Sequence, residues 1–221
     1  TILDLDAPRR VNERVMPQLT KKAAEWIGRQ KPDAPFFLYY TPVAVHNPIT
    51  PDKDLAGKSK AGIYGDWIHE LDRSVGGILN ALDKQGLTNN TLIIFSSDNG
   101  GVFKPERDSA QTTAFKAGLK VNGSLRGGKH NVWEGGFKVP FIVRWPGKVK
   151  SGSECDVPVH AVDFYPTFVS VAETKVASAL AESKTADAAK AAATLDGESL
   201  LPLLTQTGTL QRSALFWHMP T

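Results

Sequence analysis

Hydrophobic positions recur at helical spacing in two long stretches of the chain. In residues 17–30, apolar side chains fall on one helical face, and Pro17 suits the first turn of a helix. In residues 65–86, a longer apolar face ends at Gly86, a typical helix terminator. The two faces consist of Leu19, Ala23, Trp26 and Ile27, and of Trp67, Ile68, Leu71, Val75, Ile78, Leu79 and Leu82. The pattern therefore predicts two amphipathic helices.

Short continuous apolar runs bounded by Pro, Gly or polar residues are typical of buried strands. Three such runs occur, near residues 35–41, 91–97 and 139–144. They alternate with helical segments, an order that favours an α/β fold with a parallel or mixed sheet covered on both faces. We expect the three strands to be neighbours or near neighbours in one sheet, with residues 67–82 packed on a face of it.

The remaining segments carry weaker patterns. Residues 162–173 read as a helix with Asp163 as its cap, and residues 102–124 read as a long polar loop. Residues 175–194 are alanine-rich and low in complexity, which predicts a surface helix or a flexible excursion. Long loops inside compact domains are usually functional, so we expect the 102–124 loop and the glycine-rich segment after it to contribute to a functional site.

Composition narrows the function classes. The formal net charge of +3 is spread along the chain, so no basic patch predicts nucleic-acid binding. The single cysteine, Cys155, excludes an internal disulfide framework and a cysteine zinc site. No run reaches the length of a membrane span, and the chain opens with neither a signal peptide nor an initiator methionine. We therefore expect a processed product or a fragment.

Polar side chains follow the predicted strands, where ligands bind in open α/β sheets. His46 follows the first strand, Asp98 and Asn99 end the second, and Lys129 precedes the third within "LRGGKHNVWEGG". Carboxylate and amide oxygens suit calcium or magnesium, while a lysine between glycines suits a tetrahedral oxyanion such as phosphate or sulfate. The sequence therefore predicts that these four side chains converge on one cleft.

Each of these residues also has a simpler interpretation. Asp98 and Asn99 begin an Asp-Asn-Gly-Gly sequence that is a common turn, and a lone histidine such as His46 is usually structural or at the surface. Lys129 alone fits a solvated loop lysine, and Glu134 fits a helix cap or a tie within the loop. The functional interpretation therefore rests on these residues together and not on any one of them.

Six segments in the same order resemble the type I sulfatases. They are "PFFLYYTPVAVHNP", "YGDWIHELDRSVGGILNALDKQGL", "NTLIIFSSDNGG", "LRGGKHNVWEGGFKVPFIVRWPG", "VDFYPTFVSVAE" and "LDGESLLPLL". The resemblance implies an alkaline-phosphatase-like α/β/α sandwich with a mostly parallel mixed sheet. It also implies that residues 1–221 form one partial sulfatase catalytic domain, with the alanine-rich stretch at about 175–194 as a surface insert.

The resemblance assigns roles to the four residues. It implies that Asp98 and Asn99 bind Ca2+, whereas Lys129 and His46 contact the sulfate ester and act in catalysis. A metal and a lysine would stabilise charge on the transferring sulfuryl oxygens, and His46 would contact the bridging or leaving oxygen. His130 follows Lys129 where many relatives carry a smaller residue, so a substrate contact from it stays open.

One departure from the family pattern decides what the chain can do alone. Type I sulfatases use a formylglycine made from a Cys/Ser-x-Pro-x-Arg motif, and this sequence contains none. The family's amino-terminal aspartate pair, which completes the calcium site, is also missing. We expect both upstream of Thr1 in the parent protein, so the chain alone should be inactive. The resemblance further implies an exported protein, whether periplasmic, extracellular or lysosomal.

Other functions fit the same residues. A phosphodiester or phosphonate hydrolase of the same superfamily needs a similar cation clamp for its tetrahedral ester. A non-catalytic fragment could instead bind sulfated glycans through the basic residues around Lys129. The expected partners are a sulfate ester substrate, which includes sulfated polysaccharides, without nucleic acid and without a membrane span.

Overall fold

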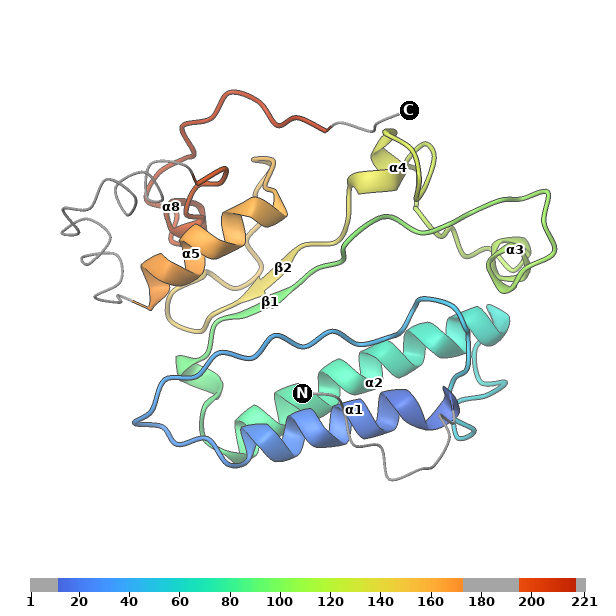
Figure 1. Ribbon diagram of the computed structural model, residues 1–221, viewed down its shortest axis with the longest axis horizontal. Coiled ribbons are helices and arrows are strands. Elements are labelled where there is room, and N and C mark those ends of the chain that lie inside the picture. Colours follow the sequence, from blue (N-terminus) through green and yellow to red (C-terminus); the bar gives the residue numbers. More distant parts are fainter. Residues whose placement is uncertain (1–11, 173–194, 218–221) are drawn as a thin grey trace. The chain divides into compact units, whose positions relative to one another are not determined.

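The computed structural model describes residues 12–172 and 195–217 (Figure 1). The chain divides into two compact units. The first unit comprises Thr1–Thr91 and Ser96–Phe141, and the second comprises Leu92–Phe95 and Ile142–Thr221. The expectation of one partial domain over residues 1–221 stays a prediction, and the alanine-rich stretch at 175–194 lies outside the described residues.

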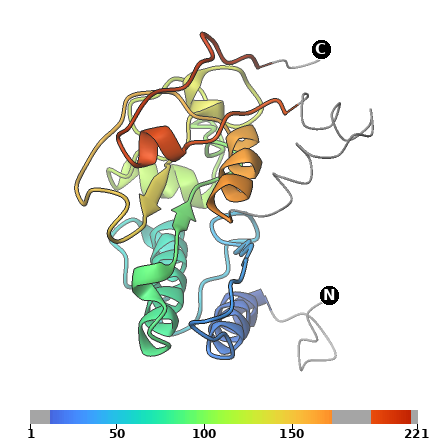
Figure 2. The same cartoon turned by 90° about the vertical axis from the view of Figure 1, so that its left-hand side faces the viewer.

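Two helices, α1 (Asn12–Ile27) and α2 (Gly62–Lys84), build the first unit and lie side by side (Figures 1 and 2). Both amphipathic helices predicted from the sequence are confirmed. Met16 of α1 and Trp67 of α2 are each 1% exposed and form the centre of the core with Ala44. Pro17 lies inside α1 rather than in its first turn, because the helix begins five residues earlier, at Asn12. Burial of the apolar face therefore outweighs the preference of proline for a first turn.

The carboxyl end of α2 closes as the sequence predicts. Gly86 has a positive φ of 68°, a conformation that glycine adopts without steric cost. The Leu87 N–H donates to the Leu82 carbonyl at 2.9 Å, and the Gly86 N–H donates to the Asp83 carbonyl at 2.9 Å. This pair of bonds is a Schellman motif, which satisfies carbonyls that the helix end would leave free.

A polar stripe is buried along α2, which the apolar periodicity did not predict. Asp66 accepts three backbone N–H bonds, from residues 57–59, at 2.7 to 3.1 Å. Glu70 accepts from the Asp52 N–H at 2.6 Å, and the Ser74 hydroxyl bonds the Tyr40 hydroxyl at 2.8 Å. Asp66, Glu70 and Ser74 are spaced four residues apart, so one helix face anchors several loops by hydrogen bonds.

The expectation of a strand at residues 35–41 is wrong, although the segment is extended. Its burial alternates: Phe36 packs edge-to-face on Trp26 at 5.7 Å, whereas Phe37 is 64% exposed and Tyr39 81% exposed. One face of the segment thus packs on helices, as a strand would. A strand also requires a neighbouring backbone to pair with its N–H and C=O groups, and a helix face cannot supply that ladder.

The second unit contains the two strands that the structure assigns, β1 (Ile93–Phe95) and β2 (Ile142–Arg144). They pair antiparallel, with Ile94 opposite Val143. The strands expected near 91–97 and 139–144 are confirmed as neighbours, although both are shorter than expected. Because the described pair is antiparallel, the mostly parallel mixed sheet stays a prediction.

Among its described residues, the second unit has the helices η2 (Ala161–Asp163), α5 (Phe164–Val171) and α8 (Leu201–Leu204). Asp163 caps differently from the expectation: its side chain accepts from the His160 N–H at 2.8 Å, within a capping box on η2. The Asp163 carboxylate also accepts from the Glu198 N–H at 3.0 Å and from the Arg212 guanidinium. Asp163 therefore joins α5 to the later segment that carries α8.

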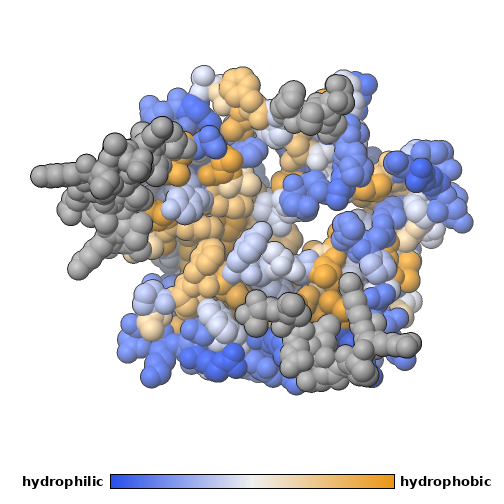
Figure 3. Space-filling model, viewed as in Figure 1, coloured by the Kyte–Doolittle hydropathy of each residue, from blue (hydrophilic) through white to orange (hydrophobic). Residues whose placement is uncertain are grey.

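The described helices include none that is long and apolar enough to cross a bilayer. Figure 3 shows hydrophobic residues gathered toward the middle of the drawn face and hydrophilic residues mostly toward its edges. Cys155 is a free, exposed thiol.

Candidate active site

The loop after β1 is tied to the glycine-rich loop that carries Lys129, and both belong to the first unit. The Gly100 N–H donates to the Gly136 carbonyl at 2.9 Å, and the Lys129 N–H donates to the Gly101 carbonyl at 3.2 Å. Asn122 adds a side-chain link, because its Oδ1 accepts from the Gly101 N–H at 2.8 Å and its Nδ2 donates to the Gly101 carbonyl at 2.9 Å. These bonds fix the backbone of Lys129 beside the segment that follows Asn99.

Close backbone contact explains the glycines of both loops. A Cβ atom on Gly135 would lie 2.7 Å from the Arg126 carbonyl oxygen, and one on Gly128 would lie 2.5 Å from the Gly101 carbonyl oxygen. A Cβ on Gly100 would overlap the Gly135 carbonyl. Real Cβ atoms do not come within 3.0 Å of such atoms, so only glycine permits this approach. The glycines serve loop-on-loop packing, and this packing positions Lys129.

Side chains brace the same loop from within. The Arg126 guanidinium stacks over the Trp133 ring, 3.6 Å from its centroid, and the Asn131 Oδ1 accepts from the Trp133 N–H at 3.2 Å. His130 adopts a positive φ of 78°, which is uncommon for a side chain other than glycine and marks local strain. The Lys129 backbone is thus held on both sides.

Glu134 lies at the beginning of a short helix. It is the first residue of α4 (Glu134–Phe137) and pairs with Lys138 at 3.7 Å, with both side chains about 60% exposed. An exposed pair of this kind contributes little to stability. The N-cap of α4 is Trp133, and no side chain of the described residues caps this helix by a hydrogen bond, so the interpretation of Glu134 as a helix cap is wrong.

Asp98 and Asn99 present oxygen atoms at the end of the loop after β1. Asp98 is exposed, and its Oδ1 accepts only a long bond from the Ser97 hydroxyl at 3.4 Å. The Asn99 Nδ2 donates to the Gly100 carbonyl at 3.0 Å, and among residues 12–172 and 195–217 no hydrogen bond occupies its side-chain oxygen, which can therefore face a cation. These donors fit calcium in type. They fall short in number, since the described residues contain no group of three or more His, Cys, Asp or Glu that could hold a metal.

His46 lies in the loop that leaves the 35–41 segment. The Trp67 indole N–H donates to the His46 carbonyl at 3.0 Å, and the His46 Nδ1 lies 2.7 Å from the Asn47 carbonyl. In the described part of the chain, no hydrogen bond or ion pair joins the His46 ring to Asp98, Asn99 or Lys129. The convergence of all four residues on one cleft therefore stays a prediction.

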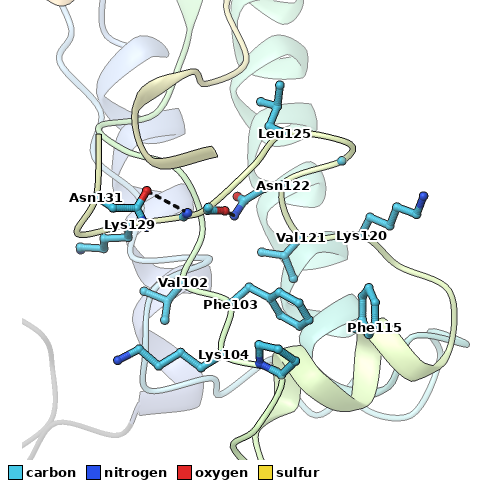
Figure 4. A pocket seen from close by; sticks show the side chains of 14 residues that line it. Val102, Phe103, Lys104, Phe115, Lys120, Val121, Asn122, Leu125, Lys129 and Asn131 are labelled. Carbon is cyan, nitrogen blue, oxygen red and sulfur yellow. Dashed lines mark hydrogen bonds between the residues drawn. The ribbon is translucent and has the colours of Figure 1, made fainter. Parts of the chain in front are cut away.

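A pocket of about 390 Å³ opens beside Lys129 (Figure 4). Part of its wall is α3 (Ala110–Lys116), a helix inside the region expected to be one long loop. The Ser109 hydroxyl caps α3 by accepting from the Thr112 N–H at 3.1 Å. The expectation of a loop over 102–124 is thus wrong in this part, because seven residues are too few to show helical periodicity. The one available signal was Ser109, a favoured cap residue.

Asn122 is the site residue that the sequence did not indicate. It precedes Gly123 and reads as an ordinary turn former. Its three side-chain bonds to the Gly101 and Gly127 backbones become visible only when two loops distant in sequence are brought together.

Comparison with known proteins agrees with these elements. The family model described as Sulfatase matches residues 8–174. Human steryl-sulfatase is 38% identical over 196 residues, which cover 89% of this chain and 30% of that protein. An N-acetylgalactosamine-6-O-sulfatase of Bacteroides thetaiotaomicron is 43% identical over 145 residues, covering 65% of this chain and 28% of that protein. The chain thus spans about 30% of the length of these curated relatives.

Solved structures show the same likeness. One from a study of glycosaminoglycan metabolism by Bacteroides thetaiotaomicron superposes with a TM-score of 0.70 at 34% identity, over 92% of this chain and 39% of that one. Another, Ps i-CgsB in complex with a neocarrahexaose, gives a TM-score of 0.66 at 28% identity, over 86% of this chain and 38% of that one. Both support an alkaline-phosphatase-like fold for the parent domain. With its family match over residues 8–174, the chain belongs to the sulfatase family.

Proposed function

We propose that the protein to which this chain belongs hydrolyses sulfuric esters, and that Lys129 and His46 act in that reaction. The observation that carries the proposal is the hydrogen-bonded contact between the Lys129 loop and the loop that carries Asp98 and Asn99. This contact brings a cation and two hard oxygen donors to neighbouring loops, as a sulfate ester site requires.

Lys129 supplies the positive charge in this proposal. Its ammonium group can donate to the non-bridging oxygens of a sulfate, and charge builds on those oxygens and on the leaving oxygen during transfer. The Lys129 N–H donates to the Gly101 carbonyl, which fixes the backbone point from which the side chain extends. His46 would donate a hydrogen bond from its ring N–H to the leaving oxygen.

Asp98 and Asn99 would supply two oxygen ligands to Ca2+. The ion, when bound, neutralises charge on the sulfate and orients it. Asp98 is exposed and Asn99 half-buried, and no short hydrogen bond from the described residues occupies their side-chain oxygens, which suits this role. The remaining ligands of the usual 6 to 8 would come from other parts of the protein.

The nucleophile is the element that this sequence lacks. No Cys/Ser-x-Pro-x-Arg motif occurs between Thr1 and Thr221, and we propose that the formylglycine lies upstream of Thr1 in the parent protein. A covalent intermediate on formylglycine would divide the hydrolysis into two easier steps. We propose that residues 1–221 form one partial catalytic domain of an exported enzyme and are inactive alone.

The direct test is turnover by a polypeptide extended upstream to include the nucleophile motif and expressed with formylglycine-generating machinery. It should hydrolyse p-nitrophenyl sulfate, whereas the variant with alanine at the nucleophile and the 221-residue chain should not. Preference for p-nitrophenyl phosphate or for bis(p-nitrophenyl) phosphate would overturn the sulfatase assignment in favour of a phosphoester hydrolase.

A further inference from the structure

The pocket beside Lys129 carries features that hydrolysis of a simple sulfate ester does not need. Its walls come from residues 102–105, from α3 and from residues 120–131, all within the first unit. Its volume of about 390 Å³ lies within the usual range of small-ligand sites, about 300 to 1,000 Å³. It is large enough for a group attached to the sulfate ester as well as for the ester.

Three lysines and no acidic residue line this pocket: Lys104, Lys120 and Lys129. In the part of the chain that the structure describes, none of the three takes part in an ion pair. Figure 4 shows Lys104 and Lys120 extending in opposite directions from the pocket, with Lys104 on the same side of the view as Lys129. Positive charges on different sides of one pocket, with no acidic side chain in its lining, favour an anionic ligand with more than one negative group.

An aromatic surface lies between the two outer lysines. Phe103 and Phe115 pack with ring centroids 4.8 Å apart, and Phe115 is 44% exposed (Figure 4). An exposed aromatic ring in a pocket suits the apolar face of a sugar ring, because the ring C–H groups pack on the aromatic face and leave the polar substituents at the edge. Lys104 and Lys120 are placed to meet such substituents.

The helix that carries Phe115 is held by contacts within the chain. This helix, α3, packs on α2, is capped by Ser109, and buries Thr112 and Ala114. The Thr112 hydroxyl further donates to the Arg107 carbonyl at 2.8 Å. A site that is formed in advance loses less conformational entropy on binding.

We propose that this pocket is a subsite for the sugar next to the one that carries the scissile sulfate, and that it selects sulfated oligosaccharides over simple aryl sulfates. The inference rests on the proposed function, since Lys129 defines where the scissile sulfate lies. Phe103 and Phe115 support the neighbouring sugar ring, and Lys104 and Lys120 bind its sulfate groups.

The test measures binding of a κ-carrageenan hexasaccharide to the 221-residue chain by titration calorimetry. The double substitution Lys104→Ala and Lys120→Ala should weaken binding about tenfold, since each removes one exposed charge-assisted contact. Phe115→Ala should weaken it roughly threefold. The matched control is Lys148→Ala with Lys150→Ala, which removes the same charge from exposed positions of the second unit and should leave binding unchanged.

Three results would overturn the subsite. They are unchanged affinity in the Lys104 and Lys120 variant, an equal loss in the control variant, and equally tight binding of a single-stranded oligonucleotide of the same charge. The thermal unfolding midpoint of each variant establishes that it is folded, and Lys104→Gln with Lys120→Gln replaces any variant that is not.

A second measurement separates the subsite from the proposed function. In the extended polypeptide, the Lys104 and Lys120 variant should raise KM for the hexasaccharide about tenfold and leave kcat for p-nitrophenyl sulfate unchanged. Binding that depends on Lys104 and Lys120, in a protein without sulfatase turnover, would contradict the proposed function and retain the subsite. If the variant hydrolyses both substrates and its KM for the hexasaccharide is unchanged, the subsite is contradicted and the proposed function is retained.

Discussion

Replacing Gly100 with alanine should separate the two loops that form the candidate site. A Cβ atom at this position would overlap the Gly135 carbonyl and lie 2.8 Å from the Gly135 carbonyl carbon. Both neighbours are backbone, so neither can turn aside as a flexible side chain would. The loops must move apart, and the Gly100 to Gly136 and Lys129 to Gly101 hydrogen bonds, at 2.9 and 3.2 Å, must lengthen.

The expected cost follows from these contacts. Overpacking in a close-packed region costs about 1 to 3 kcal/mol, and each weakened backbone hydrogen bond about 0.5 to 1.5 kcal/mol. With two such bonds weakened, the free energy of unfolding of the first unit should fall by about 2 to 6 kcal/mol. Displacement of Lys129 by roughly 1 Å should also lower turnover of the extended polypeptide on the order of a hundredfold.

The assay is urea unfolding of the 221-residue chain together with turnover of the extended polypeptide. Gly76→Ala is the matched control, because Gly76 lies inside α2 with nothing within 4 Å of its added Cβ. That change should stabilise α2 by about 0.5 to 1 kcal/mol through its helix propensity. Stability and turnover as in the original chain after Gly100→Ala would refute the role given to the glycines.

The remaining predictions concern the second unit and the metal ligands. Asp163→Ala should lower the free energy of unfolding, measured in urea, by about 3 to 5 kcal/mol, because the Arg212 side chain, 16% exposed, loses its charged partner. Asp156→Ala, a change at an exposed position, should alter it by less than about 0.5 kcal/mol. Burial opposes ionisation of Asp163, but the bonds from Arg212, His160 and Glu198 outweigh burial and lower its pKa. Its stabilisation should therefore be complete above the unfolded-state pKa of about 3.9 and be lost as the pH falls toward the folded-state pKa, and a flat acid limb in the pH dependence of unfolding would contradict this. Asp98→Ala in the extended polypeptide should weaken Ca2+ binding at least tenfold by calorimetry, while Asp108→Ala, an exposed loop change, should not.

The sequence predicted correctly those parts of the fold that depend on interactions between residues close together in the chain. The apolar face of α2 and Gly86 at its end are both local, and the structure has both. Ser109 caps a helix of seven residues, which is shorter than the window that periodicity needs. Whether residues 35–41 become a strand depends on a backbone neighbour, which periodicity does not reveal.

In the candidate site, too, the sequence indicated the reactive side chains but not the contacts between segments distant in the chain. Asp98, Asn99 and Lys129 stood out because their chemistry and their position after or before a strand were readable from the sequence. The reason for the glycines was not readable, because the atoms that exclude a Cβ at Gly100 belong to residue 135, 35 positions along the chain. Asp66 was likewise unexpected, since its burial depends on three N–H groups of residues 57–59, just before α2, and helical periodicity does not reveal such side-chain to backbone bonds.

The Lys129→Ala substitution in the extended polypeptide tests the central claim most directly. With p-nitrophenyl sulfate as substrate, kcat should fall on the order of a hundredfold or more, the usual scale for removal of one preorganised charge-stabilising group. Lys148→Ala, an exposed lysine of the second unit, should retain full turnover. Unchanged kcat in a folded Lys129→Ala variant would contradict the account and remove Lys129 from the reaction.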